Sequence, residues 1–235
     1  MAAGVERPVY RLNPSPYSSH SLLLKHFPEC RRRERVLDVG CGDGYFAALL
    51  SDRGYDVTGV EKRGGYTERF PSQVQLIEAD LENGLPPLPG RYDHVICADV
   101  LEHLRRPEFM LREIPRVLQP GGRLVASLPN SGNIYFRMNV AAGRFPQHDK
   151  GLFDRTHLRF YTWKGWQNLF DTTGWTITSV ESSAIPVGLA AAAAVSGAQE
   201  NSTAARIAES VCYGLARIRK TLFAYQFVVA AIPRG

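Results

Sequence analysis

The chain has 235 residues, of which 44% are hydrophobic and 22% are charged. This composition is typical of a globular domain and excludes collagen-like, coiled-coil and wholly disordered proteins. The formal net charge of +5 is modest, and no nucleic-acid-binding motif accompanies it, so a nucleic-acid partner is not favoured.

The four cysteines lie far apart and form no Cys-x-x-Cys pair, which is typical of proteins in a reducing compartment. The first residues contain no apolar stretch of the kind found in signal peptides. The longest apolar run, residues 185–195, is too short to span a membrane. We therefore expect a soluble, cytoplasmic protein.

Short apolar runs alternate with helical stretches, a pattern that predicts β-α units and a parallel sheet. Strands are expected at residues 35–39, 57–61, 74–79, 92–98, 123–128, 175–180 and 223–231. Helices are expected at residues 20–27, 45–52, 107–118 and 162–173, the last capped by Thr162. Pro120-Gly121-Gly122 should separate the third of these helices from the strand that follows it.

The chain is expected to divide into an N-terminal cap, residues 1–34, and a main domain, residues 35–235. Residues 129–161 read as a long loop, which is typical of a functional segment. Residues 185–221 read as a helical insertion with an apolar stripe that includes Ile207 and Val211. We expect this stripe to pack against the sheet; the alternative is a basic amphipathic surface that docks on a membrane or a protein.

The strongest local signal is the segment Asp38-Val39-Gly40-Cys41-Gly42-Asp43-Gly44, between a predicted strand and a predicted helix. Glycines allow a ligand to approach backbone N–H groups without a clash against Cβ. The frame does not fit a dinucleotide fingerprint, and no Walker lysine follows it. Asp38 at the strand end would repel a pyrophosphate and suits a cationic group such as an ammonium.

Two further acidic residues end the next two predicted strands. Glu61 stands where a carboxylate can accept hydrogen bonds from ribose hydroxyls. Asp80 can accept a hydrogen bond from an adenine amine, with Leu81 against the ring. Together with Asp38, these residues describe an adenosine without phosphates that bears an amino acid, which is S-adenosylmethionine.

Three segments carry a resemblance to a known family: residues 36–61, residues 92–104 and the Arg116-Val117-Leu118-Gln119-Pro120-Gly121-Gly122 stretch. They resemble the class I S-adenosylmethionine-dependent methyltransferases. The resemblance implies a doubly wound, Rossmann-like α/β fold, with a seven-stranded, mostly parallel sheet, an antiparallel last strand and helices on both faces. It also implies cofactor contacts from Asp38, Gly40, Cys41, Gly42, Glu61, Asp80, Leu81 and Ala98.

In open α/β sheets ligands bind beyond the carboxyl ends of the strands, which places the 129–161 loop over the cofactor. The end of this loop, residues 154–162, is similar to a segment of bacterial methyltransferases of polysaccharide and natural-product pathways. His157 is the candidate general base, because imidazole titrates near neutral pH. Its alternative role is to hold the loop by a hydrogen bond.

Other side chains are weaker candidates for the acceptor pocket. Tyr17, His20 and His148 are candidates for its lining. Arg155 and Arg159 could hold a carboxylate or a phosphate of an anionic acceptor, or brace the loop against Asp154.

A metal site is the second interpretation of this region. Asp99, Glu102 and His103, together with His157, would supply two carboxylates and two imidazoles. The arrangement is similar to that of metal-dependent ubiquinone-pathway and small-RNA methyltransferases, and it would prefer Mn²⁺ or Zn²⁺ to Mg²⁺. Metal-free relatives share the Leu-Glu-His-Leu sequence, so a divalent metal is not favoured.

These observations predict a methyltransferase that acts on a hydroxyl of a small molecule, such as a sugar or another metabolite. The alternatives are N- or C-methylation, an RNA acceptor, or a non-catalytic partner protein that binds a membrane-bound enzyme through residues 185–221.

Overall fold

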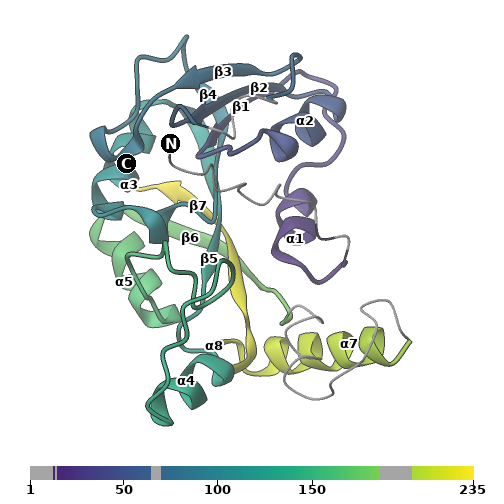
Figure 1. Ribbon diagram of the computed structural model, residues 1–235. Helices are drawn as coiled ribbons and strands as arrows, with labels where there is room; N and C mark the ends of the chain where they lie inside the picture. Colours follow the sequence, from purple (N-terminus) through teal and green to yellow (C-terminus); the bar gives the residue numbers. More distant parts are fainter. Residues whose placement is uncertain (1–12, 14, 65–69, 186–202) are drawn as a thin grey trace, which may run out of the picture.

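The computed structural model describes residues 13, 15–64, 70–185 and 203–235. Its centre is one seven-stranded sheet, ordered β3-β2-β1-β4-β5-β7-β6 (Figure 1). The strands are β1 (Arg35–Val39), β2 (Asp56–Glu61), β3 (Gln75–Glu78), β4 (Tyr92–Ala98), β5 (Leu118–Pro129), β6 (Trp175–Ser182) and β7 (Gln226–Pro233). Only β7 among these strands runs antiparallel, against both β5 and β6, which confirms the predicted fold.

Helices cover both faces of this sheet (Figure 1). They are α1 (Ser19–Lys25), α2 (Tyr45–Asp52), α3 (Pro107–Glu113), α4 (Ile134–Ala141), α5 (Trp163–Thr172), α7 (Thr203–Ile218) and α8 (Lys220–Phe223). Short 3-10 turns stand at η2 (Leu81–Asn83), η3 (Leu101–His103) and η4 (Ile114–Arg116). In the part of the chain that the structure describes, none of the helices is long and apolar enough to cross a membrane.

Alternate residues of each strand enter two core layers, because successive side chains of a strand point to opposite faces. Val36 of β1 packs with α1 and α2 residues such as Leu23 and Leu50. Its neighbour Leu37 packs on the other face, with α3 and α5 residues such as Leu111 and Trp166. The sheet is thus covered on both faces, as a parallel sheet requires.

Several predicted boundaries are wrong for identifiable reasons. The helix predicted at residues 107–118 ends at Glu113, where a single 3-10 turn that contains Pro115 follows. Strand β5 begins at Leu118 and includes the predicted break; an irregularity in its register opposite Tyr92 and His94 accommodates the extra residues.

The segments around residues 129–161 and 185–221 also differ from expectation. The predicted loop contains α4, whose N-cap Asn133 accepts a hydrogen bond from the backbone N–H of Tyr135. The last strand begins at Gln226, after the short helix α8. Residues 186–202, including most of the apolar run, lie outside the described residues.

The apolar stripe of α7 does not pack against the sheet, so that prediction is wrong. Ile207, Val211, Leu215 and Ile218 are all exposed. The helix is held instead through its opposite side, where Glu209 and Ala216 are buried.

Candidate functional site

The glycine-rich turn after β1 is fixed against the end of β2. The backbone N–H groups of Gly40 and Cys41 both donate to the carbonyl oxygen of Val60, at 2.8 and 3.2 Å. Gly40 has a φ of 71°, and a Cβ at this position would lie 2.7 Å from Cγ2 of Val100. Only glycine fits both the backbone conformation and this close approach.

A cavity of about 460 Å³ lies at the carboxyl ends of β1, β2 and β4, beside this turn. The structure places all eight predicted cofactor contacts in its lining: Asp38, Gly40, Cys41, Gly42, Glu61, Asp80, Leu81 and Ala98. Strand order explains this convergence, because β1 stands where the chain turns from one half of the sheet to the other. We call this space the first cavity.

Asp38 is the most buried acidic group of the first cavity, with 2% of its surface exposed. Its Oδ2 atom is buried and has no hydrogen-bond partner among the described residues. Burial, and then the nearby charge of Glu61, raise the pKa of Asp38 to about 7. A cationic ligand would favour the ionised carboxylate and lower this pKa again.

Glu61 and Asp80 are both held by neighbouring groups. Glu61 accepts hydrogen bonds from the backbone N–H groups of Gly42 and Lys62, both at 2.8 Å. Asp80 accepts one from Lys62 Nζ at 2.7 Å and one from the N–H of Glu82 at 3.1 Å. The hydrogen bond from Lys62 and that from Glu82 lower the pKa of Asp80. Lys62 itself is largely exposed, so solvent screens this pair.

A second cavity, of about 300 Å³, adjoins the first. His20, Asp99 and His103 line both cavities. The second cavity is also lined by residues of the 129–161 segment and by residues at or just before the start of the last strand: Leu152, Asp154, His157, Tyr225 and Gln226. A molecule in the second cavity would therefore lie directly beside one in the first.

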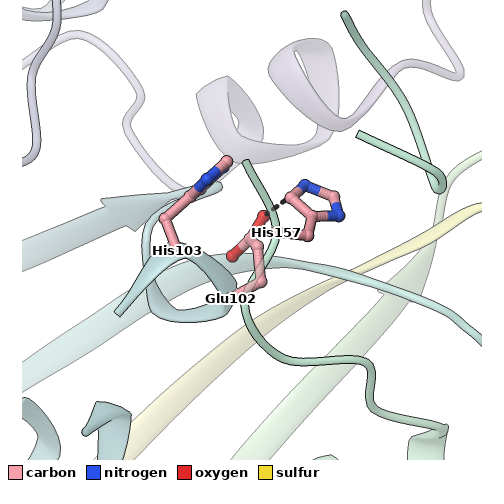
Figure 2. A group of neighbouring side chains, drawn as sticks. All are labelled: Glu102, His103 and His157. Atoms are coloured by element: carbon pink, nitrogen blue, oxygen red, sulfur yellow. Dashed lines mark ion pairs between the residues drawn. The ribbon is translucent and has the colours of Figure 1, made fainter. Parts of the chain in front are cut away.

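His157 lies in the wall of the second cavity next to Glu102 (Figure 2). Its Nε2 atom is 3.8 Å from Oε1 of Glu102, and the side chains are 7% and 0% exposed. Backbone hydrogen bonds also connect Glu102 to the segment that follows His157. The carbonyl oxygen of Glu102 accepts hydrogen bonds from the N–H groups of Leu158 and Arg159. The end of the loop is thus fixed on η3.

Neither member of this pair carries a charge easily. Burial, and then the neighbouring His103, lower the pKa of His157 to about 4. Burial, and then the charge of Asp99, raise the pKa of Glu102 well above its ordinary value. The imidazole is therefore uncharged at neutral pH, and burial favours the uncharged form of the carboxyl group that it faces.

Three of the four proposed metal ligands gather at this point. One ligand atom each from Glu102, His103 and His157 lie within 4.8 Å of one another. Both carboxylate oxygens of Glu102 are buried without a hydrogen-bond partner among the described residues, and such a group is costly unless a proton or a cation neutralises it. This oxygen and nitrogen donor set fits a transition-metal ion such as Mn²⁺ or Zn²⁺.

Asp99, the fourth proposed ligand, is held elsewhere. Its Oδ1 atom accepts hydrogen bonds from Ser127 Oγ at 2.7 Å and from Gln226 Nε2 at 2.8 Å. Its backbone has a φ of 54°, which is uncommon for a residue other than glycine. The N–H of Asp99 donates to Ser127 Oγ, so a closed network maintains this conformation between the two cavities.

The remaining predicted acceptor residues, apart from His20, do not line the second cavity. Tyr17 stacks on Tyr213 with ring centroids 4.4 Å apart. His148 is exposed and pairs through its backbone with the segment near Asp154. Arg155 forms an ion pair with Asp149 at 2.8 Å, and Arg159 donates to the carbonyl oxygen of Arg105.

Sequence reasoning missed several residues of the second cavity. Gln226 is the first residue of β7, Tyr225 directly precedes it, and Glu209 comes from α7. No local motif marks these residues. Tyr225 and Gln226 reach the cavity because β7 runs antiparallel to β5, so that its start lies at the edge where β5 ends.

Comparison with known proteins places the chain in a family. Residues 15–180 match the methyltransferase domain family. A ubiquinone biosynthesis O-methyltransferase of Aeromonas salmonicida is 30% identical over 138 residues, which are 55% of this chain and 57% of the relative. The chain therefore spans less than two thirds of that relative's length.

Two solved structures share the fold. An S-adenosylmethionine-dependent methyltransferase from Archaeoglobus fulgidus superposes with a TM-score of 0.61 at 19% identity, covering 90% of this chain and 91% of the other. A Burkholderia thailandensis 1,6-didemethyltoxoflavin-N1-methyltransferase, with bound 1,6-didemethyltoxoflavin and S-adenosylhomocysteine, superposes with a TM-score of 0.55 at 16% identity. That match covers 92% of this chain and 77% of the other.

Proposed function

The chain belongs to the methyltransferase domain family, and from this premise we propose that it transfers the methyl group of S-adenosylmethionine to a hydroxyl of a small molecule. One observation carries the proposal: the first cavity holds the acidic residues expected for an adenosyl sulfonium, and it adjoins a second cavity suited to an acceptor. The transfer is an in-line displacement, so alignment of the two molecules is the main task of the enzyme.

We assign the cofactor to the first cavity by the chemistry of its lining. Asp38 would receive the ammonium group, Glu61 the ribose hydroxyls and Asp80 the adenine amine, with Leu81 against the ring. Glu61 and Asp80 already accept hydrogen bonds, yet each carboxylate retains free lone pairs for a ligand. Gly40 and Gly42 allow the ligand to lie close to the backbone.

We assign the acceptor to the second cavity, with His157 as the group that removes its proton. The pKa of about 4 keeps the imidazole neutral at physiological pH, which is the form that can accept a proton. The same low pKa makes His157 a weak base, so proton transfer would accompany methyl transfer rather than precede it. The name of the Aeromonas relative favours oxygen as the methylated atom.

A divalent cation at Glu102, His103 and His157 is the second candidate for activation of the hydroxyl. It is favoured by the two unpartnered oxygens of Glu102, which a cation would neutralise. Such an ion would act as a Lewis acid that lowers the pKa of a bound hydroxyl. The same nitrogen of His157 cannot serve both candidates, because a nitrogen that binds the cation has no free lone pair to accept a proton from the hydroxyl.

The test is made in two stages. Isothermal titration with S-adenosylmethionine and S-adenosylhomocysteine should show binding, which Asp38→Asn and Glu61→Gln should weaken; absence of binding to both ligands would contradict the proposal. An untargeted mass-spectrometric search for metabolites that gain a labelled methyl group would then identify the acceptor. A methylated amine or carbon in the product would replace O-methylation by one of its alternatives.

A further inference from the structure

The outward side of α7 is a continuous apolar stripe. Ile207, Val211, Leu215 and Ile218 are spaced by three or four residues, so they share one face of the helix. Their exposed fractions run from 39% to 82%. A stripe of this kind normally lies in a protein core, so its exposure requires an explanation.

The stripe cannot turn inward, because the opposite side of α7 is fixed to the body of the protein. Ser15 Oγ donates to Glu209 Oε1 at 2.5 Å. Tyr213 stacks on Tyr17, and Ala216 is completely buried. These contacts hold the apolar stripe toward solvent.

Helix α4 adds exposed apolar groups at the same end of the molecule. Figure 1 shows α4, α8 and α7 along one edge, below the sheet. Met138, Val140 and Phe145, on α4 and just after it, are 63%, 47% and 51% exposed. We call the exposed faces of α4 and α7, with Phe145, the apolar end.

The charge of the apolar end has one sign. Arg137, Arg144, Arg217 and Arg219 are exposed on or beside the two helices. Residues 131–148 contain no Asp or Glu. Glu209 is the one acidic residue of α7, and it is buried. The described residues of α4 and α7 thus carry apolar side chains and arginines but no exposed carboxylate, which is typical of surfaces that bind anionic membranes.

We propose that the apolar end docks on an anionic lipid surface, with the apolar side chains among the acyl chains and the arginines at the headgroup phosphates. A second copy of the chain fits less well, because a two-fold contact would bring like-charged arginines together. Nucleic acid would leave the apolar stripe in water. Docking on the surface also agrees with the finding that no described helix could span a bilayer.

Sedimentation with vesicles tests this proposal without cofactor or acceptor, so its outcome is independent of the proposed methyl transfer. The full chain should bind vesicles containing about 30% phosphatidylglycerol and bind phosphatidylcholine vesicles at least about tenfold more weakly. Arg217→Gln with Arg219→Gln should weaken binding about tenfold or more. Val211→Ser with Ile218→Ser should weaken it similarly.

The matched control is Arg31→Gln with Arg32→Gln, which removes the same charge from exposed positions between α1 and β1 and should leave binding nearly unchanged. Thermal unfolding verifies that each variant is folded; all three pairs change only exposed side chains. The proposal is overturned if anionic vesicles do not bind, or if the control pair weakens binding as much as the α7 pairs. A dimer in sedimentation velocity that Val211→Ser with Ile218→Ser abolishes would instead make this face a contact between two copies.

Discussion

His157 Nε2 lies 3.8 Å from Glu102 Oε1, in surroundings that exclude almost all solvent from both side chains. Under the proposed function, this pair would govern how an acceptor hydroxyl in the second cavity loses its proton. The neutral imidazole of His157 suits a base that can accept a proton at physiological pH, and the two unpartnered oxygens of Glu102 suit a cation. The following predictions separate these roles and test the cofactor site.

If His157 is the base, the acid limb of the pH–rate profile should lie near pH 4 to 5. The pKa of His157 is lowered to about 4, so the imidazole becomes protonated, and inactive, only in that range. His157→Ala should reduce turnover about a hundredfold or more. His148→Ala, in the same segment but exposed, should retain activity. An acid limb near the ordinary histidine pKa, or full turnover in His157→Ala, would contradict the assignment.

The cation candidate predicts a rise in the unfolding temperature when Mn²⁺ or Zn²⁺ is added to the chelator-treated protein. Glu102→Gln should abolish that rise. Without a cation the same substitution should change stability little, because burial raises the pKa of Glu102 and so favours its protonated form, which is close in shape to glutamine. Differential scanning fluorimetry measures both effects. A rise that survives in Glu102→Gln would place the cation elsewhere.

Asp38→Asn should stabilise the protein and impair cofactor binding. The folded pKa of about 7 lies above the ordinary value of 3.8, so stability is lost as the pH rises from about 4 to 7 and stays lost above it. The amide removes this cost, and the unfolding temperature at pH 8 should rise. Titration calorimetry should show weaker binding of S-adenosylmethionine by the variant. A destabilised variant would contradict the cost assigned to the buried carboxylate.

Proton release should accompany cofactor binding to the wild-type chain near pH 7. A cationic ligand lowers the pKa of Asp38, and the carboxyl group then loses the proton that it partly holds at this pH. The apparent binding enthalpy should therefore depend on the ionisation enthalpy of the buffer. This dependence should vanish in Asp38→Asn, and a buffer-independent enthalpy in the wild type would oppose the assigned contact.

Gly42→Ala and Gly121→Ala form a matched pair. Both glycines have positive φ, 57° and 82°, and a Cβ at either meets no atom within 4 Å. Each alanine should therefore cost about 1 kcal/mol through backbone strain. Only Gly42 lines the first cavity, so only Gly42→Ala should weaken cofactor binding, by about tenfold. Equal affinity in the two variants would remove Gly42 from the cofactor site.

The sequence predicts the first cavity well because its signals are local and periodic. Asp38, Glu61 and Asp80 each stand at or just after the end of a predicted strand, and parallel strands bring such ends to one edge. The second cavity is assembled from distant segments, so Gln226 and Tyr225 carry no motif that would identify them. His157 is predicted from the place of its loop over the cofactor and from the chemistry of imidazole, and its role as the base stays a prediction.

The orientation of helix α7 could not be predicted from the sequence, for a different reason. An apolar stripe at helical spacing looks the same in sequence whether it faces a core or solvent. The contacts that decide the matter, Ser15 with Glu209 and Tyr17 with Tyr213, join residues almost two hundred positions apart. The prediction that Pro120-Gly121-Gly122 separates a helix from a strand is wrong for a related reason. Only the pairing of this segment with β4 shows that it belongs to a bulged strand.

His20, Asp99 and His103 belong to the walls of both cavities. Filling either space therefore alters the hydration and charge experienced by an occupant of its neighbour. If a molecule bound in one cavity changes the affinity of the other cavity for its ligand by some factor, that ligand must change the affinity for the first molecule by the same factor.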